Sequence, residues 1–219
     1  MPSRLSAALP SPWTLARAGD AQGLRRLHGE GVPLDLPDRV GLTPAHYAAG
    51  NGYADAVLVL IELRACVDMV DWTGTTPAHD AASDGHVEVI EVLHAGGAAL
   101  EVVNHCGMTP AHLAAVGDHA LVIDTLVRLG VPVGQATAMG GTPVHCAARH
   151  GSLEAIHALH MAGAPMDLRD PAGFTPLQLA QVRGHAQVVA ALSRALHRTA
   201  HIGLREERLD ERRRSRLPA

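Results

Sequence analysis

The sequence contains no lysine and few aromatic side chains. All 18 basic residues are arginine, so no side chain offers a primary amine for acylation-type modification. The net charge of -4 gives no bulk electrostatic reason to expect a nucleic acid as partner. One Phe, two Tyr and two Trp among 219 residues exclude a core built on large rings. The core must consist of Ala, Val and Leu, which suit short helices that stack closely on their neighbours.

Long apolar runs and paired cysteines are also missing. No stretch reaches transmembrane length without a charge, Gly or Pro, and residues 1–12 lack the apolar run of a signal peptide. The three cysteines, Cys66, Cys106 and Cys146, form an odd and unmatched set, which favours reduced thiols. We therefore expect no membrane contact and a cytoplasmic protein, with the nucleus as a second compartment if an Arg-rich segment acts as an import signal.

One unit repeats along the chain. The pair Thr-Pro occurs at residues 43, 76, 109, 142 and 175, always 33 residues apart. In four of these units a histidine stands two residues after the proline: His46, His79, His112 and His145. Thr is placed to cap a helix and Pro to begin it, because Pro lacks the amide hydrogen that the first turn cannot use. A second helix follows in each unit, with apolar residues at three- and four-residue spacing, as in Val89, Ile90 and Leu93.

This unit resembles the ankyrin repeat, and the resemblance covers roughly 195 of the 219 residues. It implies an all-α repeat solenoid of six stacked helix-turn-helix units, each with a hairpin loop. The first unit is degenerate and has Trp13 in the position of His46. We place the repeat domain at residues 12–203, between a disordered segment 1–11 and a charged helix or tail 204–219. The repeat boundaries are about 12–40, 41–73, 74–106, 107–139, 140–172 and 173–203.

Two residues depart from the pattern at helix ends. Arg64 stands where the other units end the second helix with Gly, and Asp118 stands where they end the first. Gly117, next to Asp118, can shift that turn by one residue, so we expect local distortion at both places without loss of the repeat. In the hairpin from Gly134 to Gly141, Thr137 replaces the Asp or Asn of the other hairpins, which predicts the most mobile loop.

The fifteen histidines give little support for a metal site. By the resemblance, the motif histidines brace the loops, and three more after the helix turn are also structural: His86, His119 and His185. Three others share one position in alternate repeats: His28, His94 and His160. These three lie roughly 20 Å apart, whereas the ligands of one ion lie within about 2 Å of it. Only His157 and His160, with His150 upstream, form a cluster worth testing.

Catalytic motifs are missing as well. The chain has no nucleophile elbow, no dinucleotide fingerprint and no phosphate loop. The Cys-His neighbours, His105-Cys106 and His145-Cys146, are adjacent in sequence and follow the repeat frame rather than converging on one site. We therefore expect no enzyme, no cofactor, no bound metal and no small-molecule substrate.

The resemblance implies a binding scaffold with one continuous concave surface, formed by the hairpin tips and the inner face of each first helix. We call this surface the stripe and assign to it Val40, Leu42, Tyr47, Asn51, Trp72, Thr75, Asp80, Asp84, His105, Met108, Leu113, Val116, Met139, Arg149, His150, Phe174 and Arg183. Three of the five aromatic residues belong to it, and exposed rings are costly unless a partner covers them. The alternative is that Trp72 and Phe174 only pack along their own hairpins.

The stripe changes character along its length. Asp80 and Asp84 lie toward the amino end, apolar residues occupy the middle, and Arg149 and Arg183 lie toward the carboxyl end. We therefore hypothesise a protein partner with a segment that runs along the stripe. That segment would be basic opposite the acids, acidic opposite the arginines and apolar in between.

The segment from Leu204 to Leu217 has acids and arginines three to four residues apart, which favours a solvated helix. Residues Arg212 to Arg216 resemble a nuclear-import cluster and a kinase site at Ser215; the simpler interpretation is a soluble end.

For the whole chain we predict a monomeric, non-catalytic scaffold or adaptor. Two alternatives stay open. One is a substrate adaptor of a ubiquitin ligase, although the box of that subfamily is not recognised after the repeats. The other is a regulatory or inhibitory subunit of an enzyme or transcription factor.

Overall fold

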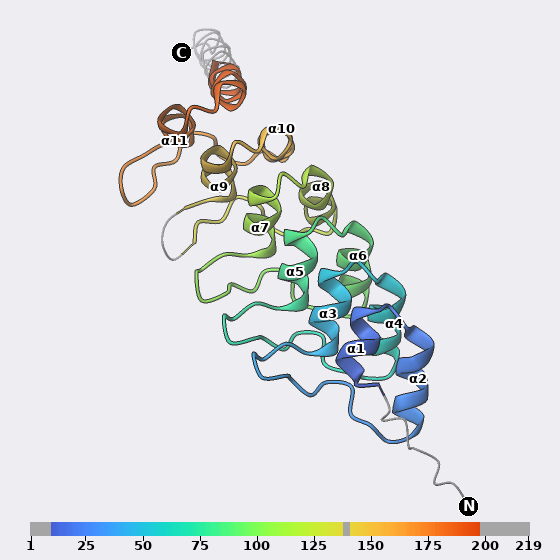
Figure 1. The fold of residues 1–219 in the computed structure, drawn as a ribbon. Helices are drawn as coiled ribbons and strands as arrows, with labels where there is room; N and C mark the ends of the chain where they lie inside the picture. Colours follow the sequence, from blue (N-terminus) through green and yellow to red (C-terminus); the bar gives the residue numbers. More distant parts are fainter. Residues whose placement is uncertain (1–9, 138–140, 198–219) are drawn as a thin grey trace, which may run out of the picture.

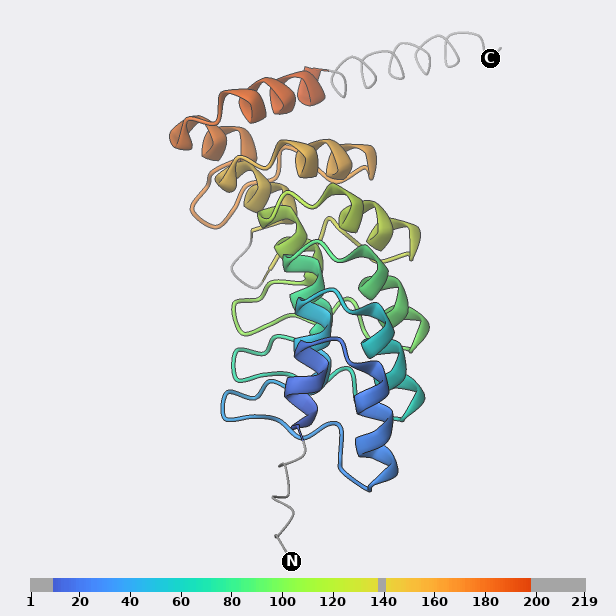
Figure 2. The ribbon, with the colours of Figure 1, turned by 45° about the vertical axis from the view of Figure 1, so that its right-hand side comes forward.

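The computed structural model describes residues 10–137 and 141–197, which form pairs of short helices stacked into an elongated solenoid. Loops project from one side of the stack, and the first helix of each pair lies next to them (Figures 1 and 2). These inner helices are α1 (Pro12–Arg17), α3 (Pro44–Gly50), α5 (Pro77–Ser83), α7 (Pro110–Val116), α9 (Pro143–His150) and α11 (Pro176–Arg183). The outer helices are α2 (Ala21–Gly29), α4 (Ala54–Glu62), α6 (Val87–Ala95), α8 (Ala120–Arg128) and α10 (Leu153–Met161), followed by helical residues 186–197. This arrangement confirms the predicted solenoid of six helix pairs.

Each inner helix from α3 onward begins with the Thr-Pro pair. Thr43 has an extended backbone with φ -91°, and Pro44 occupies the first helical position. The side chain of His46, in the third position, reaches back to the backbone N–H of Thr43, so this end of the helix carries a capping box. In α11 the same box is made by Gln178, which accepts from the N–H of Thr175 at 2.9 Å.

The core is a continuous column that runs the length of the stack. Inner helices contact the inner helices before and after them, and outer helices contact outer helices. The alanine pairs of α3, α5, α7 and α9 are fully buried, which lets these helices approach closely. One leucine per outer helix, 33 residues apart, completes the column, with at most 3% of its surface exposed: Leu27, Leu60, Leu93, Leu126, Leu159 and Leu192. Each unit therefore buries its apolar face only against its neighbours.

The first unit keeps the bracing role of the motif histidine with a different side chain. Trp13 Nε1 donates a hydrogen bond of 2.8 Å to the carbonyl oxygen of Leu36 in the following loop. His46 donates one unit later to the carbonyl of Thr75, which is 29 residues further on, whereas Leu36 is 23 residues after Trp13. The degenerate unit is thus tied to its own loop through a carbonyl at a different position of the repeat.

The two departures at helix ends keep the repeat frame. Arg64 and Asp118 adopt φ values of 64° and 60°, the left-handed conformation that glycine takes at the equivalent positions. The expected one-residue shift of the turn at Gly117 is wrong, because Gly117 keeps φ -78° and Asp118 itself takes the left-handed position. Asp118 Oδ1 also accepts from the N–H of Ala155 in the next unit at 2.8 Å, which holds it in place.

Several expectations fall on residues outside the described ranges: most of the segment 1–11, Met139, the hairpin tip at 138–140, and the charged segment 204–219 with Ser215. At the base of that hairpin, Thr137 Oγ1 accepts from the N–H of Gly141 at 3.2 Å, in the manner of the Asp residues elsewhere. Greater mobility of this loop stays a prediction. None of the helices in the described ranges is long and apolar enough to cross a membrane.

Candidate protein-binding surface

In three loops the tip is shaped by a single acidic or amide side chain at the base of the loop. Asp71 Oδ1 accepts from the backbone N–H groups of both Thr73 and Thr75, each at 2.8 Å. Asp38 and Asn104 do the same in their own loops, at 2.9 to 3.0 Å. Because the carboxylate or amide satisfies donors on both sides of the tip, the loops hold their shape without a partner.

The motif histidines join each inner helix to the next loop. His46 Nδ1 accepts from the N–H of Thr43 at 3.0 Å, so Nε2 carries the hydrogen and donates to the carbonyl of Thr75 at 3.0 Å. His79, His112 and His145 repeat this pattern, at 2.9 to 3.3 Å, to Met108, Gly141 and Phe174. Burial lowers the pKa of all four histidines. Their interpretation as braces is confirmed, and three of the carbonyls that they hold belong to stripe residues.

Trp72 projects from its loop tip with 71% of its surface exposed. One edge of the ring lies against the preceding tip, where a side chain added at Gly41 would come within 2.9 Å of Trp72 Cδ1. His105 lies in the same way against Gly74. Tip-to-tip backbone bonds, such as His105 N–H to Thr73 O at 2.8 Å, keep the loops in line. Packing along the hairpins therefore covers only a small part of the indole.

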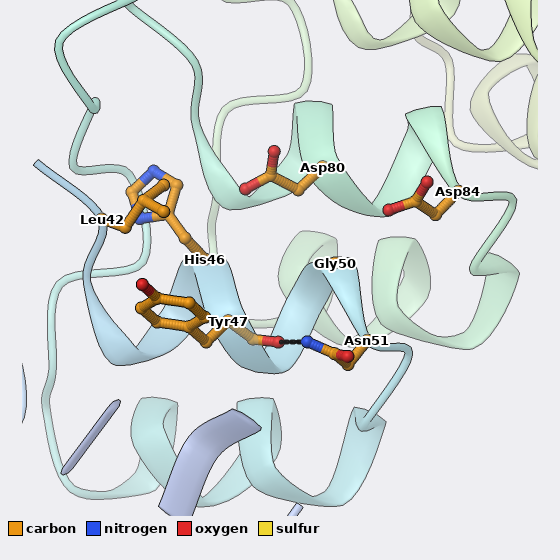
Figure 3. Close-up of a pocket in the computed structure, with 7 residues that line it drawn as sticks. All are labelled: Leu42, His46, Tyr47, Gly50, Asn51, Asp80 and Asp84. Carbon is orange, nitrogen blue, oxygen red and sulfur yellow. Dashed lines mark hydrogen bonds between the residues drawn. The ribbon is translucent and has the colours of Figure 1, made fainter. Parts of the chain in front are cut away.

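The amino-terminal part of the stripe contains a hollow of about 330 Å³ between α3 and α5, which we call the acidic hollow. Its lining is Leu42, His46, Tyr47, Gly50, Asn51, Asp80 and Asp84. Figure 3 shows Asp80 on α5 and Asp84 at the end of that helix on one side of the hollow, with Tyr47 on α3 and Asn51 at the end of α3 on the other. The hydroxyl of Tyr47 donates to Asp38 Oδ2 at 2.8 Å, and Asn51 Nδ2 donates to the carbonyl of Tyr47 at 2.7 Å. The wall opposite the acids is therefore held in place before any ligand arrives.

Asp80 is the most perturbed carboxyl group of the acidic hollow. Burial, together with the negative charges of Asp71 and Asp84, raises its pKa to about 7. Among the described residues, no side chain pairs with its half-buried carboxylate. A carboxylate that is half-buried, unpaired and open to a hollow marks a candidate binding site for a positive group.

A second hollow of about 380 Å³ lies between α7 and α9, and we call it the apolar hollow. Its lining is Cys106, Met108, Leu113, Val116, Thr137, Gly141, His145, Cys146, Arg149 and His150. Burial raises the pKa of the Cys146 thiol, so the neutral sulfur contributes to the apolar wall. Arg149 stands at the rim, 4.0 Å from a carboxylate oxygen of Asp170.

The two hollows contain ten residues of the stripe and bring them into two groups. The other six described members lie on the tips, at a loop base and at the end of α11: Val40, Trp72, Thr75, His105, Phe174 and Arg183. None of the sixteen is buried. Sequence reasoning counted Cys106 among the tip residues and Cys146 among the flanking ones, and the two line one hollow although they occupy different positions of the repeat. The 33-residue period could have predicted that the two cysteines lie close together, because the loop tip of one unit lies beside the inner helix of the next.

The remaining candidate cluster of histidines is not brought together. His157 and His160 line a small hollow on the outer side with Arg194, whereas His150 lines the apolar hollow. A neighbouring guanidinium disfavours a bound cation at the outer position. Within residues 10–137 and 141–197, no group of three His, Cys, Asp or Glu side chains is arranged to hold a metal ion.

Comparisons with known proteins agree with this architecture. The family model described as ankyrin repeats (3 copies) matches residues 13–103 and again residues 79–170. The chain is similar to the crystal structure of an ankyrin repeat domain from Acinetobacter baumannii AYE, with 28% sequence identity and a TM-score of 0.72. That similarity covers 84% of this chain and 96% of the other. No curated protein matches the sequence.

Proposed function

Since the chain belongs to the ankyrin repeat family, we propose that it is a non-catalytic module that binds a partner protein along the stripe. Members of this family generally act as protein-interaction modules, and the fold is typically non-catalytic. The proposal assigns the binding role to the loop tips and to the two hollows beside them. The carboxylates at the amino-terminal end of the stripe disfavour the phosphate backbone of a nucleic acid as the partner.

The exposed indole of Trp72 is the observation that carries the proposal. A tryptophan with 71% of its surface in water is unusual, because burial of its large apolar ring is favourable. Tryptophan side chains are also enriched at the centres of protein interfaces. It stands on a tip that is braced by Asp71 and aligned with its neighbours. A preformed surface loses little ordering entropy when a partner binds, which favours affinity.

The chemistry of the stripe supports a partner segment that follows the groove. The acidic hollow suits a basic side chain, and the apolar hollow suits an aliphatic one. Arg149 and His150, which also line the apolar hollow, and Arg183 at the end of α11 suit acidic groups of the partner. This polarity gives the partner a direction along the solenoid.

The experiment is affinity capture from a lysate of the source cells, read by mass spectrometry. Trp72→Ala combined with Met108→Ala should abolish capture of proteins that the wild type retains. The melting temperature should stay unchanged, because Trp72 is largely exposed and the Met108 carbonyl that accepts from His79 is kept.

Leu121→Ala combined with Met161→Ala is the matched control. It removes two apolar side chains, 71% and 83% exposed, from the outer helices α8 and α10. This control should leave capture intact. Equal capture by wild type and the Trp72/Met108 variant would contradict the assignment of the partner to the stripe.

A further inference from the structure

The acidic and apolar hollows are built from equivalent positions of the repeat. Five lining residues of the acidic hollow have equivalents in the apolar hollow: Leu42, Tyr47, Gly50, Asp80 and Asp84 correspond to Met108, Leu113, Val116, Cys146 and His150. Each pair is separated by 66 residues, which is two 33-residue units. The same backbone frame therefore presents two hollows with different side chains at a fixed separation.

The lining of each hollow indicates the side chain that it accepts. In the acidic hollow, Tyr47 and Leu42 form an apolar wall opposite Asp80 and Asp84. A long basic side chain fits this pairing, because its aliphatic stem packs on apolar surface while its charged head meets carboxylates. The substitution of Asp80 by Cys146 and Asp84 by His150 removes both negative charges, and Met108, Leu113 and Val116 then suit an uncharged apolar side chain.

The solenoid sets the distance between the two anchors. Packed helices lie about 8–10 Å apart, so two units place the hollows about 16–20 Å apart. An extended chain advances about 3.3 Å per residue. Five or six residues of extended chain therefore connect the two hollows along the stripe.

Building on the proposed function, we propose that the stripe binds an extended segment of a partner protein with two anchors. An Arg or Lys side chain occupies the acidic hollow, and a Leu, Ile, Met or Phe side chain five or six residues away occupies the apolar hollow. The unpaired carboxylate of Asp80 and the equivalence of the two hollows support this assignment.

A random 16-residue peptide library displayed on phage and selected against the full chain tests this inference. Enriched peptides should contain a basic and a bulky apolar residue at a separation of five or six. Selection against Asp80→Asn combined with Asp84→Asn should lose the basic residue and keep the apolar one. Synthetic copies of the enriched peptides should bind this variant at least tenfold more weakly in fluorescence polarisation, and replacement of their basic residue by Ala should then cost nothing further.

Asp124→Asn combined with Glu154→Gln is the matched control, because it removes two exposed acids from the outer helices α8 and α10. It changes the net charge by the same amount and should leave both the enriched motif and the peptide affinity unchanged. Circular dichroism confirms that each variant is folded.

The inference is wrong if no peptide is enriched, if the enriched peptides show no fixed separation, or if the basic residue persists against the Asp80/Asp84 variant. Protein capture that depends on Trp72 and Met108 is a separate measurement, so it can succeed when the two-anchor inference fails.

Discussion

At the residue scale, the buried histidines make the stability of the solenoid depend on pH. Their pKa values are lowered because burial disfavours the charged ring. Below the unfolded pKa of 6.5, the unfolded chain takes up protons that the folded chain does not. Stability is therefore fully present above pH 6.5 and is lost as the pH falls through the folded pKa values.

His112→Gln tests this linkage at one site. Gln178 already shows that glutamine completes the capping box, so the substitution keeps the bond to Thr109 and loses the bond to the carbonyl of Gly141. We expect the variant to be less stable at pH 7.5 by about 1 kcal/mol. Its deficit should shrink between pH 6.5 and 5, because one of the four titrating groups is gone. Chemical denaturation at several pH values measures this, with His94→Gln on the outer helix α6 as control. A deficit that grows in acid would contradict the prediction.

Asp80 produces a pH dependence of the opposite sign. Its pKa rises from 3.8 in the unfolded chain to about 7 in the folded chain, so the folded state holds a proton that the unfolded state releases. Ionisation of Asp80 therefore lowers stability as the pH rises from about 4 to about 7. We expect Asp80→Asn to be more stable than wild type at pH 8 by about 1–2 kcal/mol, since solvent in the open hollow screens part of the effect.

Thermal denaturation of Asp80→Asn at pH 8 and pH 4 measures this difference. The gain should largely disappear at pH 4, where the folded wild type holds the proton on Asp80 and the pH is close to the unfolded pKa of 3.8. Asp124→Asn, on the exposed face of α8, should show no such gain. An Asp80→Asn variant that is less stable at pH 8 would show that the carboxylate stabilises the fold. If Asp80→Asn stabilises the protein and also abolishes the preference for a basic residue in the bound peptide, Asp80 is retained for binding at a cost in stability.

The role of a side chain could be predicted from the sequence where it follows from the position of the residue in the repeat. The motif histidines could be assigned as braces through the resemblance to the ankyrin repeat, because each stands in the Thr-Pro-x-His motif, four times at the same interval. The perturbation of Asp80 could not be predicted. The raised pKa of Asp80 depends first on how far neighbouring side chains exclude water, and then on the charges of Asp71 from a loop and Asp84 one helical turn away.

At the scale of the helix pair, a glycine and a ring are coupled across four of the five junctions between units. The rings of His86, His119 and His185 lie over glycines of the preceding unit, where an added Cβ would come within 2.6 to 2.7 Å of a ring atom. Their Nε2 atoms donate to carbonyls 36 residues earlier, at 2.9 to 3.1 Å.

One junction differs. Asp118 occupies the glycine position, Ser152 occupies the ring position, and the hydroxyl of Ser152 donates to Val116 O at 3.2 Å. The side chain of Asp118 leaves no room for a ring, and the small serine fits.

A double-mutant cycle tests this coupling. Ser152→His alone should destabilise the protein by about 1–3 kcal/mol, because the ring meets the side chain of Asp118. Asp118→Gly alone loses the bond to the N–H of Ala155. The double variant recreates the junction found at Gly85 and His119, so it should be more stable than the sum of the single changes by at least about 1 kcal/mol. Urea denaturation of the four proteins gives the coupling energy. Additive effects would show that the two positions are independent.

Helix starts and ends could largely be predicted, because Thr-Pro and the glycines act locally. The wrong prediction at Gly117 has a specific cause. The turn keeps its position because Asp118 accepts a hydrogen bond from the next unit and faces a small residue there. Both contacts cross a junction between units, and the propensity of a single residue contains no information about them.

At the scale of the whole molecule, the 33-residue period determines which side chains share a surface. The frame, together with the geometry that the family resemblance implies, predicted the stripe, and ten of its members line two hollows. The frame did not predict that these positions would be hollow, because free volume depends on the sizes of neighbouring side chains, such as Gly50 and Val116. A stack with only nearest-neighbour contacts makes the distance between hollows a property of the number of intervening units.

Insertion of one unit between the hollows tests this dependence. A copy of residues 74–106 placed after Cys106, with Asn at the copied positions of Asp80 and Asp84, preserves the original α3–α5 and α7–α9 junctions. It should move the hollows apart by about 8–10 Å, which is about three residues of extended chain. Peptides selected against this protein should carry their two anchors eight or nine residues apart, and peptides selected against the wild type should bind it at least tenfold more weakly.

A copy of residues 140–172 placed after Ala172 is the control, because it lengthens the solenoid outside the two hollows. It should leave both the selected separation and the affinity unchanged. Since the two insertions add the same number of residues, a change confined to the first can come only from the distance between the hollows. An unchanged separation after the first insertion would mean that the anchors do not occupy these two hollows, whatever else the stripe binds.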